Sequence, residues 1–73
     1  MTLDFGEVNK YYIIERLELP LRMEKRLESL GMTNGTDVLV MNNKNQGRLI
    51  IKVRGTRLAI GRGISRNIHV RSK

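Results

Sequence analysis

The side chains in this sequence best suited to chemistry are its arginines and lysines, which recognise anions. Residues 38–73 contain nine of the 14 Lys and Arg residues and none of the seven Asp and Glu residues. Residues 1–37 contain all seven acids and the other basic residues, so the two segments carry net charges of +9 and −2. Such a basic segment either keeps a small protein in solution or docks an acidic partner: a protein, a lipid surface or a nucleic acid.

A predicted hairpin around residues 55–56 concentrates this basic charge. A two-residue loop with glycine first suits a type II′ turn, which would place Arg54 opposite Arg57 and put Lys52 on the same outer face. Like charges directly opposite destabilise a strand pair by about 0.2–1 kcal/mol. Either both guanidinium groups extend into water, or together they bind a carboxylate or phosphate of a partner. The other face of this hairpin would be apolar and buried, with Ile51, Val53, Leu58 and Ile60.

Residue sets typical of catalysis or metal binding are missing from the sequence. It has no cysteine, which excludes disulfides and thiolate metal sites and favours a reducing cytoplasm. The single histidine, His69, should point to solvent because Ile68 and Val70 beside it should face the core. The carboxylates lack metal-loop spacing, and Ser29 and Ser65 have no recognisable base partner. We therefore predict no catalytic residue, no metal ligand and no cofactor.

The elements that must position the basic residues are five predicted strands and one helix. The strands cover residues 11–17, 36–41, 48–54, 57–60 and 67–71, and a polar loop covers residues 42–47. The helix should begin near Pro20, which has the φ of a first turn. Met23, Leu27 and Leu30 then follow at helical spacing and should face inward. Arg26 borders this stripe, so its stem should cover the edge of the core.

A corner with two glycines connects this helix to the next strand. It reads Arg-Leu-Glu-Ser-Leu-Gly-Met-Thr-Asn-Gly from Arg26 to Gly35. Gly31 is expected to take the positive φ that ends a helix, and Gly35 the positive φ of the following turn.

This corner resembles the Arg-Leu-x-x-Leu-Gly-hydrophobic-x-x-Gly signature of the ferrous iron transport A (FeoA) family. The resemblance runs from about Leu3 to Val70 and includes Ile51-Lys52-Val53-Arg54-Gly55 and Ile68-His69-Val70. It implies a mainly β fold, an SH3-like small barrel of about five strands with one α-helix inserted after the first strand. The same module is similar to the C-terminal domain of iron-dependent repressors. Where the family often has a second short helix, residues 61–66 contain two glycines, each costing up to about 1 kcal/mol in a helix.

Length and hydropathy agree with a single small domain covering residues 1–73. A chain of 73 residues lies near the lower size limit for an unaided hydrophobic core. No apolar run approaches the ~20 residues that span a bilayer, and the N-terminus lacks the pattern of a signal peptide. We therefore expect a soluble protein.

The family resemblance implies a cytoplasmic, non-enzymatic accessory protein of ferrous iron uptake. Its implied partner is the membrane ferrous iron transporter FeoB, through whose cytoplasmic GTPase region it would lie near the inner membrane surface. The predicted partner-binding surface combines the basic outer face with the corner: Lys52, Arg54, Arg57, Arg26, Gly31 and Gly35.

Two points stay open at the level of sequence. The alternative function is a basic SH3-like module that binds RNA or another nucleic acid. Against it, Phe5, Tyr11 and Tyr12 all lie outside residues 38–73, so the basic surface should lack stacking platforms. A partner can also add to an unpaired strand edge, and the sequence does not indicate which edge.

Overall fold

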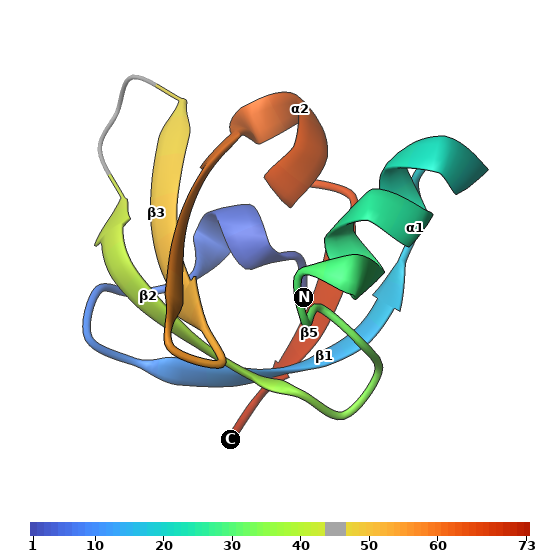
Figure 1. Cartoon of the computed structure of the whole chain (residues 1–73). Helices are drawn as coiled ribbons and strands as arrows, with labels where there is room; N and C mark the ends of the chain where they lie inside the picture. Colours follow the sequence, from blue (N-terminus) through green and yellow to red (C-terminus); the bar gives the residue numbers. More distant parts are fainter. Residues whose placement is uncertain (44–46) are drawn as a thin grey trace.

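The computed structural model describes residues 1–43 and 47–73 as a five-stranded antiparallel sheet curled around one core (Figure 1). Its strands are β1 (Tyr11–Leu17), β2 (Asp37–Asn43), β3 (Arg48–Val53), β4 (Thr56–Gly61) and β5 (Ile68–Ser72). Their spatial order is β4-β3-β2-β1-β5. Helix α1 (Leu21–Ser29) follows β1, α2 (Arg62–Ser65) joins β4 to β5, and the 3-10 turn η1 (Leu3–Phe5) precedes β1. The predicted mainly β architecture with a helix after the first strand is confirmed.

The core is built by alternate residues of the strands, because successive side chains of a strand point to opposite faces of the sheet. Polar and charged residues occupy most of the intervening positions. Register shifts in the β1–β5 and β2–β3 pairs bend these strands, and residues 62–67 join β4 to β5, the two ends of the sheet order. The buried apolar residues are Leu3, Tyr12, Ile14, Leu27, Met32, Val38, Val40, Leu49, Ile51, Val53, Ile60, Ile68 and Val70.

Helix α1 ends in a Schellman motif, which confirms the predicted role of Gly31. The amide of Gly31 donates to the carbonyl of Glu28 at 3.0 Å, and the amide of Met32 donates to that of Leu27 at 3.1 Å. Gly31 has φ +105° and Gly35 has φ +88°, both in the region that favours glycine. The Leu27 and Met32 side chains are both buried, which supplies the apolar contact that accompanies this motif.

The apolar stripe of α1 differs from the prediction at its C-terminal end. Leu27 is buried and Met23 is half-buried, as the helical spacing indicates. Leu30 is 40% exposed, whereas the prediction placed it in the core. The helix ends at Ser29 and the chain reverses at Gly31, so Leu30 leaves the inward face and Met32 enters the core instead.

The β3–β4 hairpin turns one residue earlier than predicted, so the pairing of Arg54 with Arg57 is wrong. Arg54 and Gly55 form the loop, with φ +49° and +81°, the two positive values of a type I′ turn. Lys52 is therefore the residue opposite Arg57. The predicted apolar face is confirmed. Moving the turn by one residue changes each cross-strand partner by two positions, so the same side chains still face the core. Ile51, Val53 and Ile60 are buried, and Leu58 packs against them.

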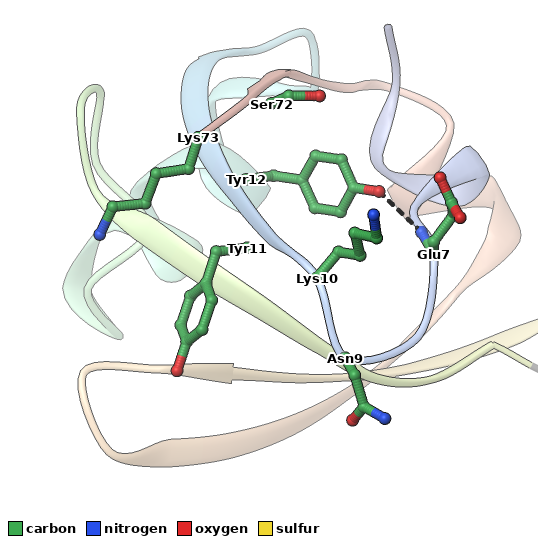
Figure 2. A pocket seen from close by; sticks show the side chains of 7 residues that line it. All are labelled: Glu7, Asn9, Lys10, Tyr11, Tyr12, Ser72 and Lys73. Carbon is green, nitrogen blue, oxygen red and sulfur yellow. Dashed lines mark hydrogen bonds between the residues drawn. The ribbon is translucent and has the colours of Figure 1, made fainter.

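The N-terminal segment seals one end of the core, which the sequence did not suggest. Leu3 in η1 is fully buried, and the Asn43 side-chain amide donates to the carbonyl of Asp4 at 3.1 Å and to that of Gly6 at 2.8 Å. The buried Tyr12 hydroxyl accepts a hydrogen bond from the backbone amide of Glu7 at 2.8 Å (Figure 2).

The polar loop predicted at 42–47 begins later than expected, because β2 extends to Asn43. Residues 44–46 of that loop lie outside the described residues.

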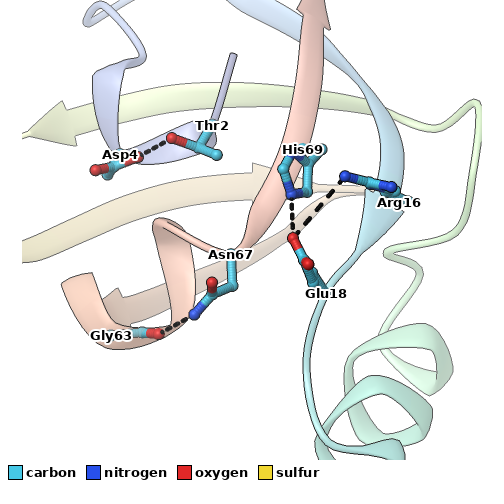
Figure 3. Close-up of polar contacts among 7 residues, drawn as sticks. All are labelled: Thr2, Asp4, Arg16, Glu18, Gly63, Asn67 and His69. Carbon is cyan, nitrogen blue, oxygen red and sulfur yellow. Dashed lines mark hydrogen bonds and ion pairs between the residues drawn. The ribbon is translucent and has the colours of Figure 1, made fainter.

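The short helix α2 forms in spite of its glycine content. Gly61 is its N-cap and Gly63 lies within it. The Asn67 side-chain amide donates to the Gly63 carbonyl at 3.0 Å (Figure 3), and Ser65 is buried. Glycine is tolerated at an N-cap, so only Gly63 weakens the helix, and these contacts offset its low helix preference.

A polar cluster connects the end of β1 to β5 (Figure 3). The His69 Nε2 lies 2.7 Å from the Glu18 Oε1, and an Arg16 nitrogen lies 3.9 Å from the same oxygen. His69 faces outward as predicted, but its side chain is only 26% exposed and is paired rather than simply hydrated. The hydrogen bond with His69, followed by the charge of Arg16, lowers the pKa of the Glu18 carboxyl below its ordinary value.

This cluster generates a pH-dependent stability. A carboxyl whose pKa is lower in the folded state stabilises the fold above its ordinary pKa of 4.5, and this stabilisation is lost as the pH falls through the folded value. Glu18→Gln should therefore lower the melting temperature at about pH 6 and have a smaller effect at about pH 3. Glu28→Gln, an exposed change on α1, is the control. An equal effect of Glu18→Gln at both pH values would contradict this assignment.

Candidate docking site

The outer face of the β3–β4 hairpin presents two opposing cations. Lys52 and Arg57 are both exposed and lie directly opposite each other in the sheet. Within residues 1–43 and 47–73, no ion pair involves Lys52, Arg54 or Arg57. The predicted pair of Arg54 with Arg57 is therefore replaced by a different like-charge pair, Lys52 with Arg57. Its two side chains can share one anionic group from outside the molecule.

A shallow hollow of about 220 Å³ lies beside this pair, on the outer face of β1, β2 and β3. It is lined by Tyr11, Asp37, Leu39, Lys52, Arg54 and Gly55. The Asp37 carboxylate is paired with the Lys73 ammonium group, which also lies 5.6 Å from the centre of the Tyr11 ring. Tyr11 is 52% exposed, so the expectation that the basic surface lacks an aromatic ring is wrong. Strand pairing places Tyr11 of β1 near β3 through Leu39 of β2.

The corner at Gly31 is in contact with the hairpin turn. A Cβ atom added to Gly31 would lie 2.7 Å from Cδ of Arg54 and 3.3 Å from Cγ1 of Val53. The aliphatic part of Arg54 therefore packs against Gly31, and a side chain added there would force Arg54 to move. Two predicted docking residues that are 23 positions apart in the sequence are thus brought together.

Gly35 occupies a different part of the corner. Its amide donates to the carbonyl of Ile14 at 2.7 Å, and the amide of Ile14 donates to the carbonyl of Thr36 at 3.0 Å. These bonds attach the turn after α1 to β1. No atom lies within 4 Å of a Cβ built on Gly35, so this turn is open to solvent.

Arg26 lines a different hollow from Lys52 and Arg54, an apolar groove between α1 and β4. The groove has a volume of about 380 Å³ and is lined by Met23, Arg26, Leu27, Leu30, Leu58, Ala59, Ile60 and Ile64. Sequence reasoning missed this groove, since helical spacing assigned Leu30 to the core. The only signal was the glycine directly after Leu30, which marks the point where the chain leaves the helix.

Two further properties of the surface concern metals and membranes. Among the residues that the structure describes, no three His, Cys, Asp or Glu side chains gather closely enough to hold a metal ion. No helix in the described part of the chain is long and apolar enough to cross a bilayer. The features described above for this surface are opposed cations, an exposed aromatic ring and an apolar groove.

Comparison with known sequences identifies a family for almost the whole chain. The family model of the FeoA domain matches residues 1–72. A putative Fe(2+) transport protein A from Methanocaldococcus jannaschii is 32% identical over 68 residues, which cover 93% of this chain and 82% of that protein.

Solved structures of other proteins share the fold of this chain. The crystal structure of an iron uptake regulatory protein (FeoA) is 29% identical, with a TM-score of 0.85 over 99% of this chain and 94% of that one. FeoA of Stenotrophomonas maltophilia, solved with zinc and described as an SH3 domain protein, has a TM-score of 0.81 over 96% of this chain and 88% of that one at 23% identity. A manganese-dependent transcriptional repressor shares the fold over 41% of its length, with a TM-score of 0.88.

The contact between Gly31 and Arg54 generates a stability prediction, for which a substitution at Gly35 is the control. Gly31→Ala places a side chain at φ +105° and against Arg54, whereas Gly35→Ala places one at φ +88° in open space. Backbone strain of this kind costs about 1–3 kcal/mol, and we expect Gly31→Ala to lose more stability in urea unfolding because of the added contact. Combining Gly31→Ala with Arg54→Ala should recover part of the difference. Equal losses for the two single variants would show that the contact contributes nothing.

Proposed function

The chain belongs to the FeoA family of ferrous iron transport accessory proteins, and we propose that it acts by binding the cytoplasmic GTPase region of a FeoB-type transporter. In this proposal the protein is cytoplasmic and lies near the inner membrane surface through its partner. Ferrous iron is the cargo of the transporter, and the accessory protein performs no reaction. Its contribution is a small, rigid surface with a fixed arrangement of charges.

The observation that carries this proposal is the exposed pair of Lys52 and Arg57. Two cations directly opposite in a sheet reduce its stability by about 0.2–1 kcal/mol. A carboxylate of a partner placed between the pair removes this repulsion and gains charge-assisted hydrogen bonds. The pair is therefore more favourable in a complex than in the free protein, as expected of a docking site.

The remaining residues of the proposed surface extend it toward the corner. Arg54 adds a third cation at the hairpin turn, and its stem lies against Gly31. Gly35 presents an open turn, to which a partner backbone can approach closely. Arg26 lies across the groove from Ala59, the second residue after Arg57 in β4. A partner that covers both the outer face and the groove would contact the four basic residues of the predicted set, and would have to extend to the corner to reach the two glycines.

Charge reversal tests the proposed surface against the purified cytoplasmic GTPase region of the transporter. Lys52→Glu with Arg57→Glu should weaken binding at least about tenfold in calorimetry, because the reversed pair repels the acidic group that the native pair attracts. The reversed pair is still a like-charge pair, so its effect on folding should be small. Arg22→Glu with Lys25→Glu, two exposed changes on α1, is the control with the same change in net charge. Unchanged binding by the hairpin variant, or no binding by the native protein, would contradict the proposal.

A second candidate function, single-stranded RNA binding, is favoured by the exposed Tyr11 ring beside Lys52 and Arg54. Base stacking on an aromatic ring contributes about 1–3 kcal/mol, so Tyr11→Ala should weaken binding of a short oligouridine measured by fluorescence anisotropy. The affinity should also fall steeply with salt concentration. Absence of saturable binding at about 0.15 M salt excludes this function.

A further inference from the structure

The two edges of the sheet differ in whether they are already paired. The outer edge of β5 is occupied by the N-terminal segment: the Val70 amide donates to the Met1 carbonyl at 2.8 Å, and Thr2 forms a bridge with His69. At the other end of the sheet β4 pairs with β3. Among the described residues, no backbone hydrogen bond joins residues 57–59 to a segment on the other side of β4. The open edge is therefore β4.

The backbone groups at this edge point in a defined direction. In a hairpin with a two-residue loop, the pair flanking the loop is hydrogen-bonded and the bonding alternates from there. Thr56, Leu58 and Ile60 therefore bond to β3, whereas Arg57 and Ala59 direct their N–H and C=O groups outward. Arg57 and Ala59 are also exposed. A strand that approaches β4 would thus meet unpaired donors and acceptors.

The apolar groove described above lies directly beside this edge. Leu58 and Ile60 of β4 form one wall, and Met23, Leu27 and Leu30 of α1 form the other. Leu30 is 40% exposed although it is a large apolar side chain. A strand added to β4 would direct every second side chain into this groove, because side chains alternate across a sheet. It would then bury the groove wall and satisfy the β4 edge at the same time.

The charges around the groove select the chemistry of its occupant. Arg26 is the charged residue that lines the groove, and Arg57 stands at the strand edge. At 100° per residue, Glu24 and Glu28 lie on the flank of α1 opposite to Arg26. Side chains of the added strand that point away from the groove would lie on the outer face beside Arg57, and Arg26 adds basic charge at the groove itself. The observations favour a segment that alternates apolar with acidic residues.

From these observations we propose that β4 accepts an extended segment of a partner protein in which apolar and acidic residues alternate. This β-augmentation deepens the proposed function, because it names the strand edge and the kind of segment that docks there. Only the identity of the partner rests on the proposed function. Backbone hydrogen bonds to Arg57 and Ala59 would hold the segment, and the groove would select its apolar side chains.

The test uses residue-resolved amide hydrogen exchange, which detects strand addition and not contact in general. The probe is a seven-residue capped peptide of alternating valine and glutamate, with a valine–lysine peptide as the control. The glutamate peptide should slow exchange of the Arg57 and Ala59 amides at least about tenfold, whereas the lysine peptide should not. The cytoplasmic GTPase region of the transporter is the second probe, added to the same labelled protein.

Substitutions at Ala59 separate the backbone bond from side-chain effects. Ala59→Pro removes the outward N–H group, whereas Ala59→Thr retains it and adds a residue that favours strands. Binding of the glutamate peptide should weaken at least about tenfold for the proline variant and remain within about twofold for the threonine variant. Leu30→Gln, at an exposed position, tests the groove wall if the proline variant does not fold, and it should weaken binding as well.

The outcomes distinguish this inference from the proposed function. Transporter binding without protection of the Arg57 and Ala59 amides would overturn the inference and leave the proposed function standing. Protection by the glutamate peptide without any transporter binding would support the inference and contradict the proposed function. Lack of protection with both probes, or a dimer of the free protein that Ala59→Pro converts to a monomer, would overturn the inference, the latter in favour of pairing between two copies.

Discussion

The structure depends most on the reversal of the chain at the end of α1. Gly31 takes φ +105°, and the amide of Met32 returns to the carbonyl of Leu27. This brings Leu27 and Met32 together in the core and fixes where α1 ends relative to the sheet. The same reversal leaves Leu30 outside and creates the space that the stem of Arg54 fills. The core, the groove and the corner of the proposed docking surface therefore share one local constraint, a backbone position with φ +105° that favours glycine.

A small barrel of this kind has a low free energy of unfolding, and some features of its surface lower that free energy further. A domain of 73 residues buries a smaller share of its surface than a larger one, so its stability is marginal. The N-terminal segment covers the β5 edge, and hydrogen bonds from Asn43 hold that segment in place. By contrast, Lys52 and Arg57 repel each other, the β4 edge is open and Leu30 is exposed. These unfavourable features lie on or beside the β3–β4 hairpin, as expected if binding relieves them.

The fold and the function rest on different observations. An SH3-like fold is shared with a transcriptional repressor at 15% identity, so the architecture alone does not specify iron transport. The family assignment comes from the match over residues 1–72 and from a relative at 32% identity. The proposed mode of action comes from the surface: a pair of opposed cations on the outer face, and an open edge beside an apolar groove. In the proposal, each of these surface features would recognise a partner by charge and shape.

The sequence by itself determined the order of the five strands and α1, the buried faces of β3, β4 and β5, and the glycine that ends α1, because these follow from local periodicity and from glycine at positive φ. It did not determine the register of the β3–β4 hairpin. Local preference places glycine first in the turn, whereas the structure has Arg54 there with φ +49°, and its stem packs against Gly31. Nor could helical spacing separate Leu30 from the core. Whether a side chain at the edge of a helix is covered depends on the distance to β4, and only tertiary packing sets that distance.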